Sequence, residues 1–363
     1  MATLGISDMK QWALPTYWDA AYLEKYRLAS GETYDGIVAQ IGTGLALANA
    51  ALTTDPLIAS LISTTEEIAV EYGIGVSNGF QTHTEYSRPD GKRGATTGHM
   101  LPLLAYDRGL GWTWDFLRKA RRKQLDEDVA SALMDLKDIW EQRILTRLFK
   151  STYDAVGSGR SMPLADGGTA DAAYVPKPRP DRGGTFVYTH DHIAPLSGIT
   201  QANLETAVAN LYEHGYDAPY DLLIAYADIA SWTNTTNVTG YVPKKSDLIT
   251  YGATADLANV DQSFIGVVET DYGTCRMRAS GRIPTAFWSV YKSYGNLDQR
   301  NPLLVRIPAD GGLGARLMRG DHIREYPLEL AILFFECGVG IQDRVGAVVI
   351  KNHADTYADP TIS

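Results

Sequence analysis

The chain has 363 residues, of which 45% are hydrophobic and 21% charged, so it can bury a sizeable core in two or three sub-domains. Its formal net charge of −10 argues against tight, sequence-independent wrapping of nucleic acid, because such wrapping needs a basic surface. The sequence has no secretory signal, no apolar run near the ~20 residues of a membrane span, and only two cysteines, Cys275 and Cys337. We therefore expect a protein that folds in a reducing cytoplasm, has no membrane partner and keeps both thiols free and buried.

The first part of the chain, residues 1–52, consists of short helical patches and an unusually aromatic stretch. The aromatic residues of this stretch are Trp12, Tyr17, Trp18, Tyr22 and Tyr26. Aromatic rings with a polar tip suit wet interfaces. The segment therefore predicts an arm that lies on a surface, either on the chain's own core or on a neighbouring subunit.

Residues 66–104 are expected to form an extended hairpin. In its first leg every second residue from Ile68 to Val76 is apolar, which is the period of a half-buried strand. The sequence SRPDGKRG supplies the turn at the tip. A long hairpin buries little of itself, so we expect its charged tip to make ion pairs with an adjacent subunit. The tip residues are Arg88, Asp90, Lys92 and Arg93.

Residues 112–150 contain neither Gly nor Pro. They are expected to form one helix about 55 Å long, far longer than an average globular helix. Apolar residues recur every three or four positions and predict one buried stripe. The residues of this stripe are Leu125, Val129, Leu133, Leu136, Trp140, Ile144 and Leu148. No sustained heptad is visible, so we expect a single helix with its charged side in solvent, rather than a coiled coil.

The middle of the chain begins with a Gly/Pro-rich excursion over 154–198, which predicts an irregular loop. A helix follows, for which Thr200 can act as the N-terminal cap, with Gly215 at its end. Further on, PYDLLIAYADIASW predicts a buried strand that runs into a short helix, and several more strands are expected after it. Two apolar runs close the chain, and we expect both to be strands.

The motif with the most chemistry is THDHIAP, in which His190 and His192 are two residues apart. On a strand this spacing can place both imidazoles on one face as metal ligands. A metal site needs a third and a fourth ligand, and the other five histidines are scattered along the chain. We therefore favour a loop-to-strand junction with exposed histidines. A soluble metal-dependent hydrolase that uses His190 and His192 is the alternative.

The other motifs carry little chemistry. The stretches IGTGLALANA and VGSGRS lack the lysine and the spacing of a phosphate-binding loop, and they predict a packed helix and a turn. A basic cluster at the start of the long helix predicts a solvated face or an ion-pair surface between subunits. The cluster comprises Arg118, Lys119, Arg121, Arg122 and Lys123. We therefore expect no enzymatic activity and no cofactor.

The order of these parts resembles the major capsid proteins of tailed bacteriophages, whose Hong Kong 97-type fold is also used by bacterial encapsulin shells. The resemblance covers nearly the whole chain and divides it into five segments. These are an N-terminal arm (1–52), an extended-loop hairpin (53–105), a peripheral domain with the long helix and the Gly/Pro-rich loop (106–198), an axial domain (199–320), and returning peripheral strands with a C-terminal segment (321–363).

The resemblance implies an α+β fold and a structural protein that self-assembles into hexamers and pentamers. These would form an icosahedral head shell around double-stranded DNA in the virion, after assembly in the host cytoplasm. An encapsulin-type nanocompartment shell is an alternative, although encapsulins are usually shorter than this chain. The packaged DNA would meet no specific binding site, and a scaffold protein, a portal and decoration proteins would be the other partners.

The resemblance also implies roles for the last strands. The late strand would run beside the long helix, with Leu328, Leu330, Ile332 and Phe334 towards it and Trp140 packed against the strand around Ile332 and Phe334. Some relatives crosslink subunits between a Lys and an Asn, for which Lys92 and Asn352 are the candidates. A lysine at a hairpin tip is far more often a solvated charge, so we expect no crosslink here.

Overall fold

The computed structural model describes residues 31, 34–74, 95–113, 119, 121–153, 161–165, 191–244, 263–319, 328–353 and 356–362. The chain divides into two compact units, each built from three stretches. Unit 1 comprises Met1–Ala50, Ala105–Lys137 and Gly314–Phe335, and unit 2 comprises Ala51–Leu104, Asp138–Leu313 and Glu336–Ser363. The five-segment division made from the sequence stays a prediction.

Unit 1 contains most of helix α3 (Tyr34–Thr54) and the first part of helix α5 (Arg122–Phe149). Helix α5 is the long helix predicted from the sequence, but its start at residue 112 was wrong. Residues Trp112 and Thr113 instead end strand β4 (Leu104–Thr113), in which buried Leu110 and Trp112 alternate with exposed glycines. The indole Nε1 of Trp112 donates to Asp128 Oδ2 at 2.9 Å. The absence of Gly and Pro therefore did not mark the start of the helix, because the alternation of buried and exposed residues in β4 continues to Trp112.

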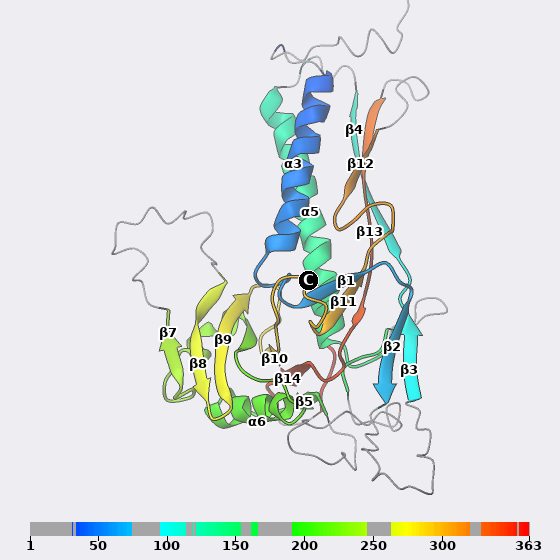
Figure 1. Cartoon of the computed structure of the whole chain (residues 1–363). Coiled ribbons are helices and arrows are strands. Elements are labelled where there is room, and N and C mark those ends of the chain that lie inside the picture. Colours follow the sequence, from blue (N-terminus) through cyan, green and yellow to red (C-terminus); the bar gives the residue numbers. More distant parts are fainter. Residues whose placement is uncertain are drawn as a thin grey trace, which may run out of the picture. The chain divides into compact units, whose positions relative to one another are not determined.

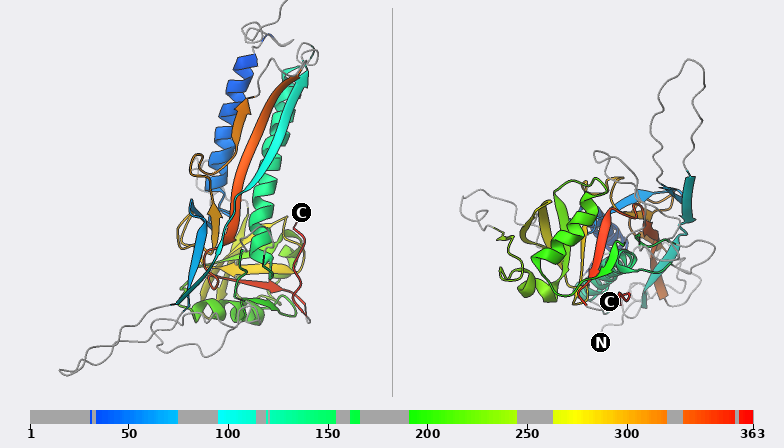
Figure 2. Two further views of the ribbon diagram at one scale, coloured as in Figure 1. Left: turned by 90° about the vertical axis from the view of Figure 1, so that its right-hand side faces the viewer. Right: turned by 90° about the horizontal axis from the view of Figure 1, so that it is seen from below.

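The strands of unit 1 are β4, β12 (Arg316–Arg319) and the first part of β13 (Leu328–Ile341). Strand β13 pairs with β12 in antiparallel register, with Met318 opposite Ile332, and it also pairs with β4. Figure 2 shows the three strands side by side. The rings of Tyr106 on β4 and Phe335 on β13 stack with their centroids 6.2 Å apart. These ring contacts fix the pairing of two strands that are far apart in the sequence.

The core face predicted for β13 is wrong by one residue. Burial within the chain falls on Leu333, Phe335 and Cys337, which are 5%, 4% and 3% exposed, whereas Ile332 and Phe334 are only partly buried. The side chain of Leu330 lies outside the described residues. Large apolar residues lie on both faces of the run AILFFECGV, with Ile332 and Phe334 on one face and Leu333 and Phe335 on the other, so a period of two did not by itself select one.

Unit 2 is built on a seven-stranded sheet in the order β5-β14-β10-β6-β9-β8-β7. Its strands are β5 (Ile193–Pro195), β6 (Tyr220–Ala225), β7 (Tyr241–Pro243), β8 (Phe264–Thr270), β9 (Gly273–Ser280), β10 (Phe287–Tyr291) and β14 (Ala347–Lys351). Helix α6 (Gln201–Tyr212) packs against β8, β10 and β14 and covers one face of this sheet (Figure 1). As predicted, β6 is buried along its whole length. It leads through the short helix η2 (Tyr226–Asp228) into α7 (Ile229–Trp232).

Helix α6 begins and ends where the sequence predicted. The Thr200 side chain caps its first turn by accepting from the Asn203 backbone N–H at 3.2 Å, and Gly215 follows the helix with a φ of +92°. Its buried face has helical spacing and consists of Leu204, Ala207, Val208 and Leu211. Of the helices in the described ranges, none is long and apolar enough to cross a membrane.

Two smaller groups of strands complete unit 2. Strand β1 (Ile62–Thr65) pairs in parallel with β11 (Leu303–Arg306), which pairs antiparallel with the end of β13, Leu303 opposite Ile341. Strand β2 (Ala69–Ile74) pairs antiparallel with β3 (Ala95–Met100). This pairing confirms that the two legs of the predicted hairpin run side by side at its base.

Candidate functional site

The base of the hairpin is anchored in unit 2 by the apolar face predicted for its first leg. Val70 and Tyr72 are buried and pack in one cluster with Leu101, Leu304 and Val345. The Tyr72 hydroxyl donates to the backbone carbonyl of Ile341 on β13. The rings of Tyr72 and His99 stack across the two legs with centroids 5.7 Å apart. The hairpin is therefore fixed at its base by packing and by hydrogen bonds.

Gly338 and Gly340 on β13 allow the hairpin strands to approach this closely. A Cβ atom at position 338 would lie 2.5 Å from the Pro102 carbonyl oxygen, and one at position 340 would lie 3.0 Å from a Leu101 methyl group and 3.1 Å from His99 Nε2. Backbone atoms cannot move out of the way as a flexible side chain can. Gly338 in ECGVG therefore has a structural reason, which is the close approach of β13 to the Pro102 backbone, whereas Gly340 faces side-chain atoms.

The tip residues Arg88, Asp90, Lys92 and Arg93 lie outside the described residues, as does Arg118 of the basic cluster. Of the rest of that cluster, Arg121 and Lys123 are exposed. Arg122 donates to Asp126 Oδ1 at 2.6 Å, one helical turn further on, and also to Gln40 of α3. This local ion pair accounts for one of the five basic residues.

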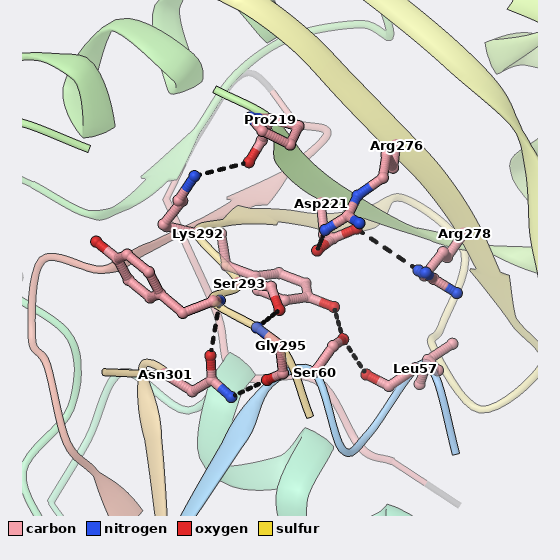
Figure 3. A network of polar contacts seen from close by, with 12 residues as sticks. Leu57, Ser60, Pro219, Asp221, Arg276, Arg278, Lys292, Ser293, Gly295 and Asn301 are labelled. Carbon is pink, nitrogen blue, oxygen red and sulfur yellow. Dashed lines mark hydrogen bonds and ion pairs between the residues drawn. The ribbon is translucent and has the colours of Figure 1, made fainter. Parts of the chain in front are cut away.

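A polar network lies on the face of the seven-stranded sheet that carries Asp221, Arg276 and Arg278 (Figure 3). The Nη2 atom of Arg276 donates to Asp221 Oδ2 at 2.7 Å, and the Nε atom of Arg278 lies 3.6 Å from Oδ1. The Tyr291 hydroxyl is 3.1 Å from Ser60 Oγ, which in turn donates to the Leu57 carbonyl at 3.2 Å. The network thus ties the segment before β1 to the sheet.

Burial controls the protonation of this network. It raises the pKa of Asp221 above the ordinary aspartate value, and the two arginines offset only part of that rise. Burial also raises the pKa of Tyr291, with a smaller contribution from the Asp221 charge. The Lys292 pKa is lowered by burial and by nearby Arg276, while its ammonium donates to the carbonyls of Asp217 and Pro219. No group here is placed as a nucleophile beside a base, so the network acts as a structural clamp.

Most of the predicted stripe on α5 is buried. Leu125 and Leu136 are buried in unit 1. In unit 2 the buried residues of the stripe are Trp140, Ile144 and Leu148, which are 1%, 0% and 0% exposed. Val129 and Leu133 are only partly buried. Contact of Trp140 with β13 stays a prediction, although the strand face named for it has to be corrected as above.

A shallow groove of about 220 Å³ in unit 1 explains why Val129 and Leu133 are only partly buried. It lies between α3 and α5 and is lined largely by apolar atoms. The lining residues are Gln40, Ile41, Arg122, Leu125, Asp126, Val129, Ala130 and Leu133. From Ala39 to Thr54 helix α3 has no charged residue, and Leu47 on it is 69% exposed. The exposed side of α3 from Ala39 to Thr54 is therefore unusually apolar for a helical surface.

The histidine motif is placed differently from the prediction. His190 lies outside the described residues. His192 is fully buried, so the prediction of an exposed histidine at this position was wrong. Its Nδ1 is 3.0 Å from the Ala347 carbonyl oxygen, and its Nε2 is 3.1 Å from Nε2 of His214. Within the described ranges, no three His, Cys, Asp or Glu side chains come together as metal ligands. Sequence reasoning missed this pair because its second member lies 22 residues away, beyond α6.

Three further predicted residues have structural roles. Cys275 and Cys337 are free and buried as predicted, and burial raises the pKa of each thiol to about 12. The side-chain oxygen of Asn352 accepts from the Gly198 backbone N–H, so this proposed crosslink acceptor is part of the fold. The nearby C-terminal segment is held to the end of α5 by the Tyr357 hydroxyl, which donates to the Phe149 carbonyl at 2.5 Å.

The chain's similarity to known proteins is found among solved structures. No protein-family model matches the chain, and no curated protein matches it. Among solved structures, a chain from Mycobacterium phage Patience matches with a TM-score of 0.63 and 22% identity, over 96% of this chain and 97% of that one.

Two weaker likenesses have TM-scores below 0.5. The SrpI encapsulin from Synechococcus elongatus PCC 7942 matches with a TM-score of 0.48 and 14% identity, over 84% of this chain and 91% of that one. The capsid of a native GTA particle matches with a TM-score of 0.46 and 10% identity, over 83% of this chain and 91% of that one.

The likeness to the chain from Mycobacterium phage Patience extends over nearly all of this chain. The chain therefore has an α+β fold of the Hong Kong 97 type.

Proposed function

We propose that this protein is the major capsid protein of a tailed bacteriophage. It self-assembles into hexamers and pentamers that form the icosahedral head shell around double-stranded DNA. The observation that carries the proposal is the match in fold to a phage chain over 96% of this chain and 97% of the other. Because the likeness spans both proteins almost end to end, it concerns the whole architecture and not one shared motif.

The chemistry of the described surfaces supports a structural role. The base of the hairpin is fixed in unit 2 by Tyr72 and Val70, which is the anchorage that a segment reaching a neighbouring subunit would need. The exposed side of α3 offers an uncharged surface of the kind that subunit contacts use. Both features are expected in a protein whose partners are copies of itself.

A metal-dependent hydrolase is the less supported function. Its candidate ligand His192 already uses both ring nitrogens inside the fold, on Ala347 and on His214. Binding a metal would require breaking one of these contacts in a fully buried position. We therefore propose a non-enzymatic protein without a cofactor.

The partners and location follow from the proposed role. A net charge of −10 favours a neutral or negative inner surface, on which packaged DNA slides without being pinned. Scaffold, portal and decoration proteins are the other partners that we propose, with assembly in the host cytoplasm and a final location in the virion capsid. A strongly basic inner surface in an assembled particle would contradict this account of the DNA.

Electron microscopy of the purified protein, combined with sedimentation velocity, tests the proposed function. A capsid protein gives closed shells or ring-shaped capsomers, whereas a hydrolase gives a small oligomer with stoichiometric bound metal. A nanocompartment shell of the encapsulin type gives closed particles that enclose protein cargo and no DNA. A monodisperse small oligomer under all assembly conditions would overturn the proposal.

We further propose that the hairpin tip makes ion pairs with a neighbouring subunit. The double reversal Arg88→Glu with Lys92→Glu is expected to impair shell assembly, while circular dichroism and the unfolding midpoint of the free subunit stay unchanged. The matched control is the charge-conserving pair Arg88→Lys with Lys92→Arg, which should assemble. Normal assembly of the reversed variant at physiological salt would show that the tip charges are merely solvated.

A further inference from the structure

The contact between His192 and His214 joins three parts of unit 2. His192 precedes β5, and its backbone N–H donates to Ala165 at 2.7 Å while its carbonyl accepts from Val349 of β14 at 2.8 Å. His214 lies just after the end of α6. Both side chains are buried, at 0% and 8% exposed, and their rings are 5.0 Å apart. The pair therefore links the end of α6 to the strands at one edge of the sheet.

The hydrogen-bond geometry fixes the protons of the neutral pair. A carbonyl oxygen can only accept, so His192 carries its proton on Nδ1 and donates to Ala347 at 3.0 Å. Nε2 of His192 is then the acceptor, and Nε2 of His214, 3.1 Å away, is the donor. Adding one proton preserves this contact, because one Nε2 atom can still donate to the other.

A second proton cannot be accommodated in the same geometry. With both imidazoles protonated, two N–H groups face each other across 3.1 Å, and two positive charges lie together in a buried position. Ionisable residues on the elements that meet here include Asp191 and Glu213 beside the histidines, Glu205 on α6 and Lys351 on β14, with Tyr216, Asp217, Asp343 and Arg344 in the adjoining turns. Asp343 already accepts from the Tyr216 hydroxyl, and Arg344 donates from Nε to the Pro163 carbonyl at 2.9 Å.

We propose that the His192–His214 pair is an acid-sensitive contact, which opens when both imidazoles are protonated and releases the end of α6 from the segment that leads into β5. The folded chain then binds fewer protons than the unfolded chain below the ordinary histidine pKa of about 6.5. Stability is therefore highest above that pH and falls as the pH is lowered. For each proton that the unfolded chain binds and the folded chain does not, the folding equilibrium constant falls about tenfold per unit decrease in pH.

The test compares urea unfolding of the wild type with His214→Gln and His353→Gln between pH 8 and pH 5. A glutamine amide at position 214 can donate to neutral His192, or present its oxygen to protonated His192, so no second charge arises. We expect this variant to have the same folding equilibrium constant as the wild type at pH 8. Between pH 8 and pH 5 that constant should fall about tenfold less in the variant than in the wild type. His353 is exposed, so His353→Gln should retain the acid sensitivity of the wild type. Equal pH dependence in His214→Gln and the wild type would overturn the proposal.

A second measurement needs no variant and does not depend on the proposed capsid role. Exchange of the imidazole C2 hydrogen with deuterium, followed by mass spectrometry across pH, reports the protonation of each histidine separately. The proposal predicts two separate steps for the pair, with the second at a lower pH than the ordinary histidine pKa of about 6.5. A single step for both residues near the ordinary histidine pKa of about 6.5 would overturn it, even if His214→Gln fails to fold.

Discussion

Asp221 on β6 lies directly across from Arg276 on β9, and the Arg276 guanidinium donates to the Asp221 carboxylate at 2.7 Å. The Asp221 side chain is fully buried, whereas the Arg276 side chain is 39% exposed. The ion pair therefore spans the boundary between the core and solvent. Arg278 approaches the same carboxylate from two residues further along β9. The two arginines therefore offset part of the cost of burying the Asp221 carboxylate in the sheet.

We expect Asp221→Ala to destabilise the subunit by about 3–5 kcal/mol, because it removes the counter-charge together with the acceptor atoms and the volume that the side chain places beside Arg276 and Arg278. Asp221→Asn keeps an acceptor for Arg276 and has the same size, so it should cost only about 1–2 kcal/mol. Urea denaturation of unassembled subunits measures both values. Equal losses for the two variants would show that the stabilisation comes from the carboxylate charge, which both variants lack, and not from the volume or the acceptor that asparagine retains.

The raised pKa of Asp221 gives a prediction about pH. The folded chain holds the Asp221 proton more tightly than the unfolded chain, whose aspartate pKa is about 3.9. The stability of the wild type relative to Asp221→Asn should therefore rise as the pH is lowered from 7 towards 4, and fall as the pH rises through the raised pKa. Unfolding measured on both proteins over this range tests the sign. A difference that shrinks on acidification would contradict it.

Trp140 should be among the most sensitive positions on α5. It is 1% exposed, and truncation of a buried tryptophan to alanine costs about 3–5 kcal/mol through lost burial and a residual cavity. Lys137 on the same helix is exposed, so Lys137→Ala should stay within about 0.5 kcal/mol. Glu141 is unsuitable as a control, although its position on the helix suggests an exposed charge, because it accepts from Arg282 at 2.6 Å. Equal losses for Trp140→Ala and Lys137→Ala would show that this stripe is not in the core.

The register of β13 can be tested with two adjacent phenylalanines. Phe335→Ala should cost about 3–5 kcal/mol because that ring is buried and stacks on Tyr106. Phe334→Ala removes a partly buried ring and should cost clearly less in the free subunit, whatever it does to assembly. Denaturation of both variants decides between the two faces. A larger loss for Phe334→Ala would restore the face predicted from the sequence.

The two cysteines should resist alkylation while the chain is folded. With a thiol pKa of about 12, roughly one thiol in ten thousand is ionised at pH 8, and both sulfurs are buried. Iodoacetamide should therefore label neither Cys275 nor Cys337 until denaturant is added, as mass spectrometry can show. Rapid labelling of one cysteine in the folded chain would indicate that its surroundings open easily.

Some features of the protein were determined by the sequence alone, because they depend on neighbours within a few residues. The ends of α6 follow from the Thr200 cap and from Gly215, which takes up a positive φ. The inward face of the hairpin base follows from the alternation through Val70 and Tyr72. The order of such elements along the chain was enough to predict the Hong Kong 97-type fold.

Other features were decided by tertiary structure, because they depend on residues that are distant in the sequence. β13 carries large apolar residues on both faces, so its packing against the rest of the chain selected Phe335 over Phe334 for burial. Trp112 ends a strand, and does not begin a helix, because it lies in the sheet and bonds to Asp128. His192 is buried because the end of α6 supplies His214 as a partner, and Asp221 because β9 supplies two arginines. A local pattern carries no record of such partners, since burial of a polar group depends on what folding places opposite it.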